Sequence, residues 1–136
     1  GQFIGARDVE HAINKMTTTG NERLIITERG HTFGYNNLVV DMRGFPIMKS
    51  FGYPVVIDAT HSIQLPSAGG GKSSGEREFV APMAQAAVAA GADGVFMETH
   101  ENPEIALCDG PNMIFLSEVA RLLQRLKTIH ALVREP

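Results

Sequence analysis

The sequence has 136 residues, with 12 lysines and arginines, 15 aspartates and glutamates, and a formal net charge of −3. Its composition, 43% hydrophobic and 20% charged, is typical of one globular domain or part of one. The weakly acidic charge argues against a nucleic-acid-binding protein, and the single cysteine, Cys108, excludes an internal disulfide framework. No apolar run approaches the roughly 20 residues that cross a bilayer, and the N-terminus does not resemble a signal peptide. We therefore expect a cytoplasmic protein with neither nucleic-acid nor membrane partners.

Helical and strand-like patterns alternate along the chain. The expected elements are, in order, a helix over 9–16 ended by Gly20, a strand over 23–27, a helix over 38–49 that Gly44 and Pro46 would break or kink, a strand over 54–58, a helix over 76–90 ended by Gly91, a strand over 94–97 and an amphipathic helix over 116–132. None of the three strands alternates polar with apolar residues. We therefore expect parallel strands with both faces buried beneath helices.

This alternation predicts an α/β sheet, either open or closed into a barrel. Three strands are few for either form, since a complete (β/α)₈ barrel takes about 250 residues. A parallel sheet of three strands would also leave long apolar edges unpaired. The pattern therefore indicates about half of a larger sheet.

A glycine-rich segment, 67–75, follows the second predicted strand. A phosphate-binding loop would need a glycine where Pro66 stands, so Gly71-Lys72-Ser73 does not indicate a nucleotide site. The segment also contains G-x-S-x-G around Ser73, but a serine nucleophile of that type needs a tight turn from strand to helix rather than a long loop. A surface linker, or a lid that closes over a substrate, fits the segment better.

Polar residues follow the ends of the predicted strands. His61, Glu98, His100 and Asp109 are candidate metal ligands, because histidine with carboxylates suits a divalent transition metal. Each alone would be an ordinary loop residue, but parallel strands bring their carboxyl ends to one edge. Arg29 suits a phosphate or carboxylate, or else an ion pair with Glu28.

Five segments carry a more specific resemblance. They are Thr27-Glu28-Arg29-Gly30, the run FGYNNLVVDM over 33–42, the run DATHSIQ over 58–64, Glu98-Thr99-His100, and the run CDGPN over 108–112. In order and spacing they closely resemble the 3-deoxy-D-manno-octulosonate 8-phosphate synthases, and the opening Gly1-Gln2-Phe3 resembles the end of that family's fifth barrel strand.

The resemblance implies a (β/α)₈ (TIM) barrel, with residues 1–136 as the C-terminal portion of a single domain, from the end of strand five through helix eight. The family condenses phosphoenolpyruvate with arabinose 5-phosphate and releases phosphate, in lipopolysaccharide biosynthesis. The resemblance also implies a homotetramer at full length. The family's ligand cysteine (an asparagine in metal-free members), most lysines for phosphoenolpyruvate and the Asn-Arg segment for the sugar precede the residues matched here. Cys108 is not that ligand position.

Site residues are carried over from the family by position. His61, Glu98 and Asp109 match three of four metal positions, for a divalent metal such as Zn, Fe or Mn in a metal-dependent member and for no metal in a metal-free one. His61 and Asp109 are the catalytic candidates. The candidates for binding substrate are Arg29 for the phosphate of phosphoenolpyruvate, and Gln64, Ser73 and Ser74 for the sugar phosphate.

Several alternatives remain open at this stage. The related 3-deoxy-7-phosphoheptulonate synthase uses erythrose 4-phosphate, and the sugar-specific Asn-Arg segment would separate the two. A non-catalytic half-barrel or interaction subunit is a second class, and a hydrolase built on Ser73 is a distant third. Membership of the 3-deoxy-D-manno-octulosonate 8-phosphate synthases predicts that His61, Glu98 and Asp109 meet, with side-chain tips no more than about 8 Å apart. It also predicts little activity for these residues alone.

Overall fold

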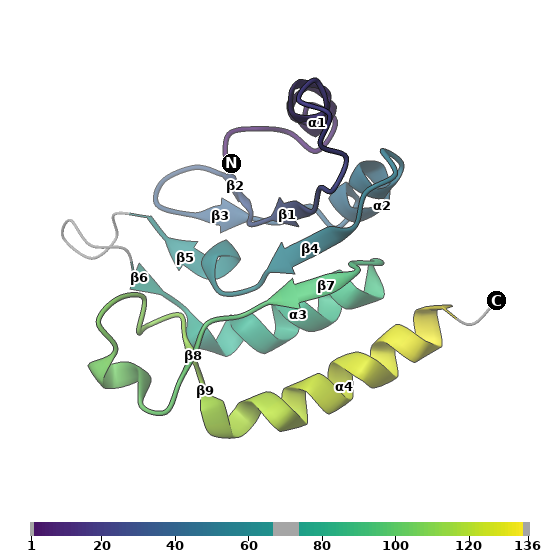
Figure 1. Ribbon diagram of the computed structural model, residues 1–136. Coiled ribbons are helices and arrows are strands. Elements are labelled where there is room, and N and C mark those ends of the chain that lie inside the picture. Colours follow the sequence, from purple (N-terminus) through teal and green to yellow (C-terminus); the bar gives the residue numbers. More distant parts are fainter. Residues whose placement is uncertain (1, 67–73, 135–136) are drawn as a thin grey trace.

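The computed structural model describes residues 2–66 and 74–134. At its centre, three strands form a parallel sheet in the order β1 (Ile26–Glu28), β4 (Val55–Asp58) and β7 (Gly94–Phe96) (Figure 1). The predicted strands and their parallel arrangement are confirmed, although the first begins later than the expected residue 23. The chain before it turns, with the Arg23 N–H donating to the Asn21 side chain at 2.9 Å.

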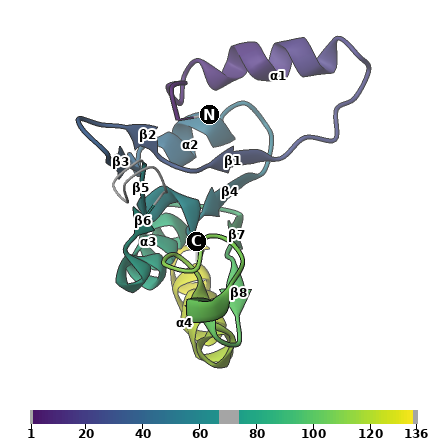
Figure 2. The ribbon, with the colours of Figure 1, turned by 90° about the vertical axis from the view of Figure 1, so that its left-hand side faces the viewer.

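Helices cover one face of this sheet. α2 (Gly44–Lys49) packs on β1 and β4, α3 (Val80–Ala89) packs on β4 and β7, and α4 (Leu116–Arg134) packs on α3. α1 (Val9–Thr17) lies beyond β1 on the side of α2, as both ribbon views show (Figures 1 and 2). These helices follow the predicted order. α3 is preceded by a 3₁₀ turn, Arg77–Phe79, within the expected range 76–90.

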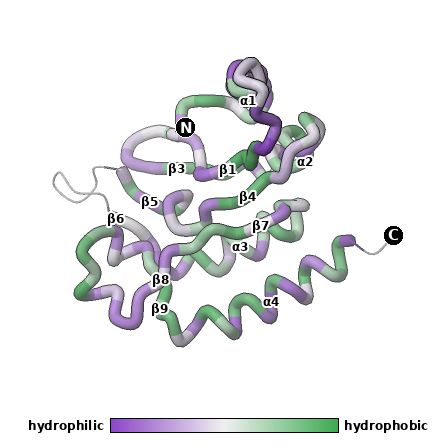
Figure 3. Tube along the Cα trace, in the orientation of Figure 1, coloured by the Kyte–Doolittle hydropathy of each residue, from purple (hydrophilic) through white to green (hydrophobic). Residues whose placement is uncertain are grey.

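The core lies between the sheet and these helices. Phe45 of α2, Val55 and Ile57 of β4, and Val80 and Ala84 of α3 are fully buried. The hydropathy-coloured trace shows β4 as a largely apolar segment and α4 with apolar and polar residues in alternation (Figure 3). Burial of this apolar surface is the main force that holds the helices to the sheet.

The opposite face of the sheet is partly exposed, so the prediction that both faces are buried is wrong for the part of the chain that the structure describes. Thr27 and Val56 are neighbours on this face. Phe96 of β7 lies on the same face and is 46% exposed. Alternate residues of a strand point to opposite faces. The helices therefore shield Ile26, Val55 and Ile57 but leave Thr27 and Phe96 in contact with solvent.

Short pairings and turns gather beyond the carboxyl ends of the central strands (Figure 1, left). The paired segments are β2 (His31–Thr32) with β3 (Leu38–Val39), β5 (Gln64–Leu65) with β6 (Ser74–Gly75), and β8 (Thr99–His100) with β9 (Ile114–Phe115). The 3₁₀ turns here are His61–Ile63 and Pro103–Ile105. These segments place the polar residues that follow each strand at one end of the sheet.

The predicted helix over 38–49 is wrong in its first half. Leu38 and Val39 form β3 instead, because they pair with β2, and the chain then turns at Asp41, whose backbone carbonyl accepts the Gly44 N–H at 2.8 Å. The helix begins at Gly44 and places Pro46 in its first turn, where a missing N–H is tolerated. The expected break at Gly44 is thus the start of α2.

Over residues 2–66 and 74–134, no helix combines the length and the apolar character needed to cross a bilayer.

Candidate functional site

His61 is held firmly just after β4. Asp58, the last residue of that strand, accepts the His61 backbone N–H at 2.9 Å through Oδ1. Its Oδ2 lies 2.7 Å from Nδ1 of the His61 ring. The ring of Phe96, at the end of β7, stacks on the imidazole with 6.1 Å between centroids. The contact of Nδ1 with Asp58 and the stacking on Phe96 together fix the His61 ring, with Nε2 directed away from Asp58.

Glu98 reaches the same point from the end of β7. Its backbone N–H donates to Oγ1 of the fully buried Thr60 at 2.8 Å, which joins the β4 and β7 turns. Glu98 Oε1 lies 3.6 Å from His61 Nε2. Glu98 Oε2 is buried and, within the described residues, has no hydrogen-bond partner. An unpartnered buried carboxylate oxygen is costly and usually has a functional or ligand-related reason.

Asp109 enters from the loop between β8 and β9. Its backbone adopts a left-handed conformation with φ of 50°, which is uncommon for a residue other than glycine. The turn closes as its carbonyl accepts the Asn112 N–H at 2.8 Å, and Oδ1 accepts the Gln64 side-chain N–H, also at 2.8 Å. A strained backbone that is held by such contacts is characteristic of functional sites.

These three side chains converge as predicted. One potential ligand atom from each of His61, Glu98 and Asp109 lies within 4.8 Å of the others. The distance is well inside the predicted limit. It exceeds the separation of directly bonded atoms and leaves room for an ion or water among the three.

The donor set fits a divalent cation. One imidazole and two carboxylates suit Zn, Fe or Mn better than Ca or Mg, because Ca and Mg prefer ligands that are all oxygen atoms. The unpartnered oxygen of Glu98 would gain a partner from a cation at this point. His61 Nε2 and Glu98 Oε1 face each other at 3.6 Å, an arrangement that a positive charge between them would stabilise.

Arg29 lies beside this cluster, at the end of β1. Its guanidinium donates to Oε1 of Gln64 and Oε1 of Gln2, each at 3.3 Å. Glu28 does not pair with it among the described residues. Its Oε1 accepts the Gly30 N–H at 2.6 Å and so pins the left-handed turn at Gly30, where φ is 85°. The structure therefore directs Arg29 toward the site rather than toward the neighbouring acid.

Gln64 joins the two halves of the site. Its amide oxygen accepts from Arg29 at 3.3 Å, and its amide nitrogen donates to Asp109 at 2.8 Å. A side-chain amide can do both at once, whereas a carboxylate could not donate. Gln64 thus holds the guanidinium and the His/Asp/Glu cluster at a fixed separation.

Other predicted residues lie outside this cluster. His100, a candidate ligand by its position, is wrong in that role: it belongs to β8, and its Nδ1 accepts the Asn102 N–H at 2.9 Å. Ser74 lies in β6 and pairs with Leu65, next to Gln64. Ser73, like the rest of 67–73, lies outside the described residues. Cys108 is exposed, and a hydrogen bond to Asp109 raises the pKa of its thiol.

Asp58, Thr60 and Gln2 contact the site residues although no sequence pattern pointed to such a role. Asp58 stands three residues before His61, a spacing that would have signalled a contact between their side chains had a turn been predicted there. Thr60 and Gln2 gave no comparable signal. Their contacts with Glu98 and Arg29 depend on segments that meet only in the folded protein.

Parallel strands with a histidine–carboxylate cluster and an arginine at their carboxyl ends define an α/β protein with the layout of an enzyme that acts on an anionic substrate. Comparison with known proteins agrees. Residues 1–135 match the DAHP synthetase I family, and the chain belongs to that family.

Several curated relatives of the chain share one name. The chain is 58% identical over 134 residues to the 2-dehydro-3-deoxyphosphooctonate aldolase of Trichlorobacter lovleyi and 59% identical to that of Geobacter sulfurreducens. Each match covers 98% of this chain and 49% of the relative. Against the protein of the same name from Geobacter sp. strain M21, identity is 57% over 135 residues. The resemblance to 3-deoxy-D-manno-octulosonate 8-phosphate synthases is confirmed, and the chain spans about half the length of these relatives.

Proposed function

We propose that the protein to which this chain belongs condenses phosphoenolpyruvate with arabinose 5-phosphate to give 3-deoxy-D-manno-octulosonate 8-phosphate and phosphate. The observation that carries the proposal is the meeting of His61, Glu98 and Asp109 beside Arg29. The relatives that share 57–59% of these residues are named for the same product. Such a site offers a guanidinium that binds an anion, with the polar His61 cluster a few ångströms away. A phosphorylated substrate with a reacting carbonyl requires both.

His61, Glu98 and Asp109 would hold a divalent cation in a metal-dependent member, with a fourth ligand from outside residues 1–136. When bound, such a cation would polarise the aldehyde of the sugar and orient water. In a metal-free member, the same three side chains would hold water directly by hydrogen bonds. His61 and Asp109 are the proposed catalytic residues in either case, because Asp58 and Gln64 fix their orientation.

The proposed reaction forms a bond between C3 of phosphoenolpyruvate and the aldehyde carbon, and the aldehyde oxygen gains a proton. Positive charge develops at C2, where water adds and gives up a proton. The hydroxyl left on C2 then gives up its proton and becomes the C2 carbonyl, as the bond between C2 and the phosphate oxygen breaks and inorganic phosphate leaves with that proton. Arg29 would bind that phosphate before and during its departure, in a partly dehydrated site where a guanidinium contact is strongest.

The sugar phosphate would lie toward β5 and β6. Gln64 begins β5, and Ser74 pairs with Leu65 one residue further along that strand. Ser73 and Ser74 are proposed to contact the sugar phosphate together with Gln64. Because Gln64 contacts both Arg29 and Asp109, this would bring the sugar close to the phosphate-binding guanidinium and to the His61 cluster, with its aldehyde near C3 of phosphoenolpyruvate.

We also propose that residues 1–136 form the C-terminal portion of one (β/α)₈ barrel, from the end of strand five through helix eight. The half-length match and the partly exposed face carrying Thr27 and Phe96 support this. Along the described residues, β1 and β7 each pair on one side only. Earlier strands of a barrel would pair with these two edges and cover that face. A cytoplasmic homotetramer is the assembly that the resemblance suggests for the full-length protein.

A chimera tests the proposed activity. It joins the N-terminal half of the Geobacter sulfurreducens relative to this chain in place of the matching half, where identity is 59%. We expect phosphate release from phosphoenolpyruvate that depends on arabinose 5-phosphate, and little release by the 136-residue chain alone. A folded chimera without such turnover would contradict the proposal. Preference for erythrose 4-phosphate by the natural full-length protein would favour the related heptulonate synthase.

A further inference from the structure

Asp58 makes two contacts with His61 through different oxygens. One accepts the His61 backbone N–H at 2.9 Å, and the other lies 2.7 Å from the ring Nδ1. Asp58 is only 8% exposed and ends β4, so the rigid sheet fixes its position. Its carboxylate does not belong to the group of converging ligand atoms, which contains His61, Glu98 and Asp109.

We propose that Asp58 is a positioning residue: it holds His61 in the tautomer with its proton on Nδ1, and so leaves Nε2 free to bind a divalent cation or water. The inference rests on the site put forward under the proposed function. It concerns a residue that touches neither substrate nor ion and acts through the imidazole.

The geometry favours this tautomer. An ionised carboxylate only accepts hydrogen bonds, so at 2.7 Å the shared proton must be supplied by His61 Nδ1. On the other side of the ring, Nε2 lies 3.6 Å from Glu98 Oε1, too far for a direct hydrogen bond. A proton on Nε2 would therefore gain little from Glu98, whereas an ion or water between the two atoms would satisfy both. Histidines that bind metals commonly donate their other N–H to a carboxylate in this way.

Asp58→Asn separates positioning from simple structural support. The asparagine keeps an oxygen for the His61 backbone N–H and presents its amide NH₂ to the ring. Nδ1 must then accept rather than donate, which moves the ring proton to Nε2. The cation-binding nitrogen is blocked although shape and volume hardly change. A purely structural role for Asp58 predicts no change of tautomer.

Asp93→Asn is the matched control. Asp93 lies at the other end of the same sheet and accepts the Val55 backbone N–H at 3.0 Å through one oxygen, as Asp58 does for His61. The control therefore removes a comparable carboxylate and backbone contact without touching His61. Circular dichroism checks that both variants are folded.

The experiment has two readouts on the chimera. ¹⁵N NMR with labelled histidine, assigned through His61→Gln, gives the tautomer of His61 in metal-free protein at about pH 8.5. Competition with a chromophoric chelator gives the affinity for Zn²⁺. We expect the Nδ1–H form in the parent and in Asp93→Asn, and the Nε2–H form in Asp58→Asn. We also expect about 10–100-fold weaker Zn²⁺ binding in Asp58→Asn alone.

The outcomes separate this inference from the proposed function. An Nε2–H form in the parent overturns the inference, and that measurement stands even where Asp58→Asn does not fold. An unchanged tautomer or unchanged Zn²⁺ affinity in folded Asp58→Asn overturns it as well. If the parent binds no Zn²⁺ yet the tautomer changes as described, the positioning role is supported and only the metal-dependent form of the site fails.

Discussion

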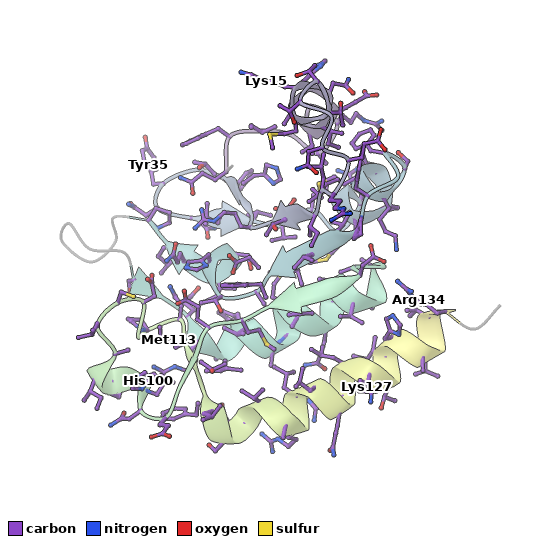
Figure 4. The ribbon with its side chains drawn as sticks, viewed as in Figure 1. Lys15, Tyr35, His100, Met113, Lys127 and Arg134 are labelled. Carbon is purple, nitrogen blue, oxygen red and sulfur yellow. The ribbon has the colours of Figure 1, made fainter. Side chains whose placement is uncertain are left out.

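The carboxylates at the two ends of the parallel sheet differ in how fully their oxygens are paired. At the amino end, Asp93 accepts from Lys49 Nζ at 2.8 Å, from an Arg134 guanidinium nitrogen at 2.7 Å and from the Val55 backbone at 3.0 Å. At the carboxyl end, a buried oxygen of Glu98 has no partner among the described residues. Figure 4 labels a residue near each end, with Arg134 at the end of α4 far from His100.

The carboxylate at the amino end stabilises the fold, whereas those at the carboxyl end are available to bind a ligand. Burial alone would raise the pKa of Asp93, but hydrogen bonds from Lys49 and the Val55 backbone, with the nearby charges, lower it overall. A carboxylate paired in this way favours the folded state at neutral pH. Over residues 2–66 and 74–134, no lysine or arginine forms an ion pair with Glu98 or Asp109, and the fold keeps the two carboxylates together at a cost that a ligand would offset.

The largest effect that this comparison predicts is that of His61→Gln in the chimera. Because His61 lies at the centre of the carboxyl-end cluster, we expect kcat/KM to fall by about 10²–10⁴-fold. Asp93→Asn, measured alongside under the same conditions, should keep near-parental turnover. Equal losses in both variants would mean that the two ends do not differ in function.

Arg29→Ala should have the next largest effect. Loss of the guanidinium removes charge-assisted hydrogen bonds to a phosphate, so we expect the KM for phosphoenolpyruvate to rise about 10–100-fold. Arg29→Lys should recover only part of this, because an ammonium cannot replace the planar fork. Steady-state kinetics with each substrate varied separately provide the measurement. An unchanged KM for phosphoenolpyruvate in Arg29→Ala would remove the anion-binding role.

Asp93→Asn should act on stability instead. Its loss weakens contacts with Lys49 and Arg134 and the bond from Val55, so the free energy of unfolding should drop by about 1–2 kcal/mol. The lower part of that range is favoured by the partial exposure of both cations. Urea unfolding monitored by circular dichroism gives the value, and no loss would show that the amino-end pairs do not stabilise the fold.

The smallest effect concerns the pH dependence of the same variant. The pKa of Asp93 in the folded protein lies below its ordinary value of 3.8. Its contribution is therefore fully present above pH 3.8 and is lost as the pH falls through the folded pKa. The stability difference between parent and Asp93→Asn should be larger at about pH 6 than at about pH 3. A constant difference would contradict the assigned cause.

The sequence predicted the elements better than their surroundings. Alternating β and α patterns located β4, β7 and α4, and the rule that parallel strands share a carboxyl end led to the convergence of His61 with Glu98 and Asp109. The two-residue strand β3 was missed because β2 and β3 contribute only two residues each to a short hairpin, which is too few to show a periodicity. The exposed side of Phe96 could not be foreseen, because an apolar strand does not reveal what covers it.

Part of the site was equally hidden. Gln64 and Arg29 were expected in the site, but the Gln64 amide contacts Arg29 across 35 residues of sequence and Asp109 across 45, and such contacts have no local signature. Asp58 was predicted as the last residue of a strand and opens the run DATHSIQ that carries the family resemblance, but neither observation gave it a role in the site. Its contact with His61 depends on the 3₁₀ turn that begins directly after Thr60, which sequence patterns of this length do not specify.

Glu98→Gln in the chimera tests the central claim most directly, when turnover and the free energy of unfolding are measured on the same preparation. The substitution removes a charge that the described residues leave partly unpaired. We expect turnover to fall by about 10²-fold or more, while the free energy of unfolding stays unchanged or rises by about 0.5–1 kcal/mol. Full turnover, or a loss of stability like that of Asp93→Asn, would contradict the account.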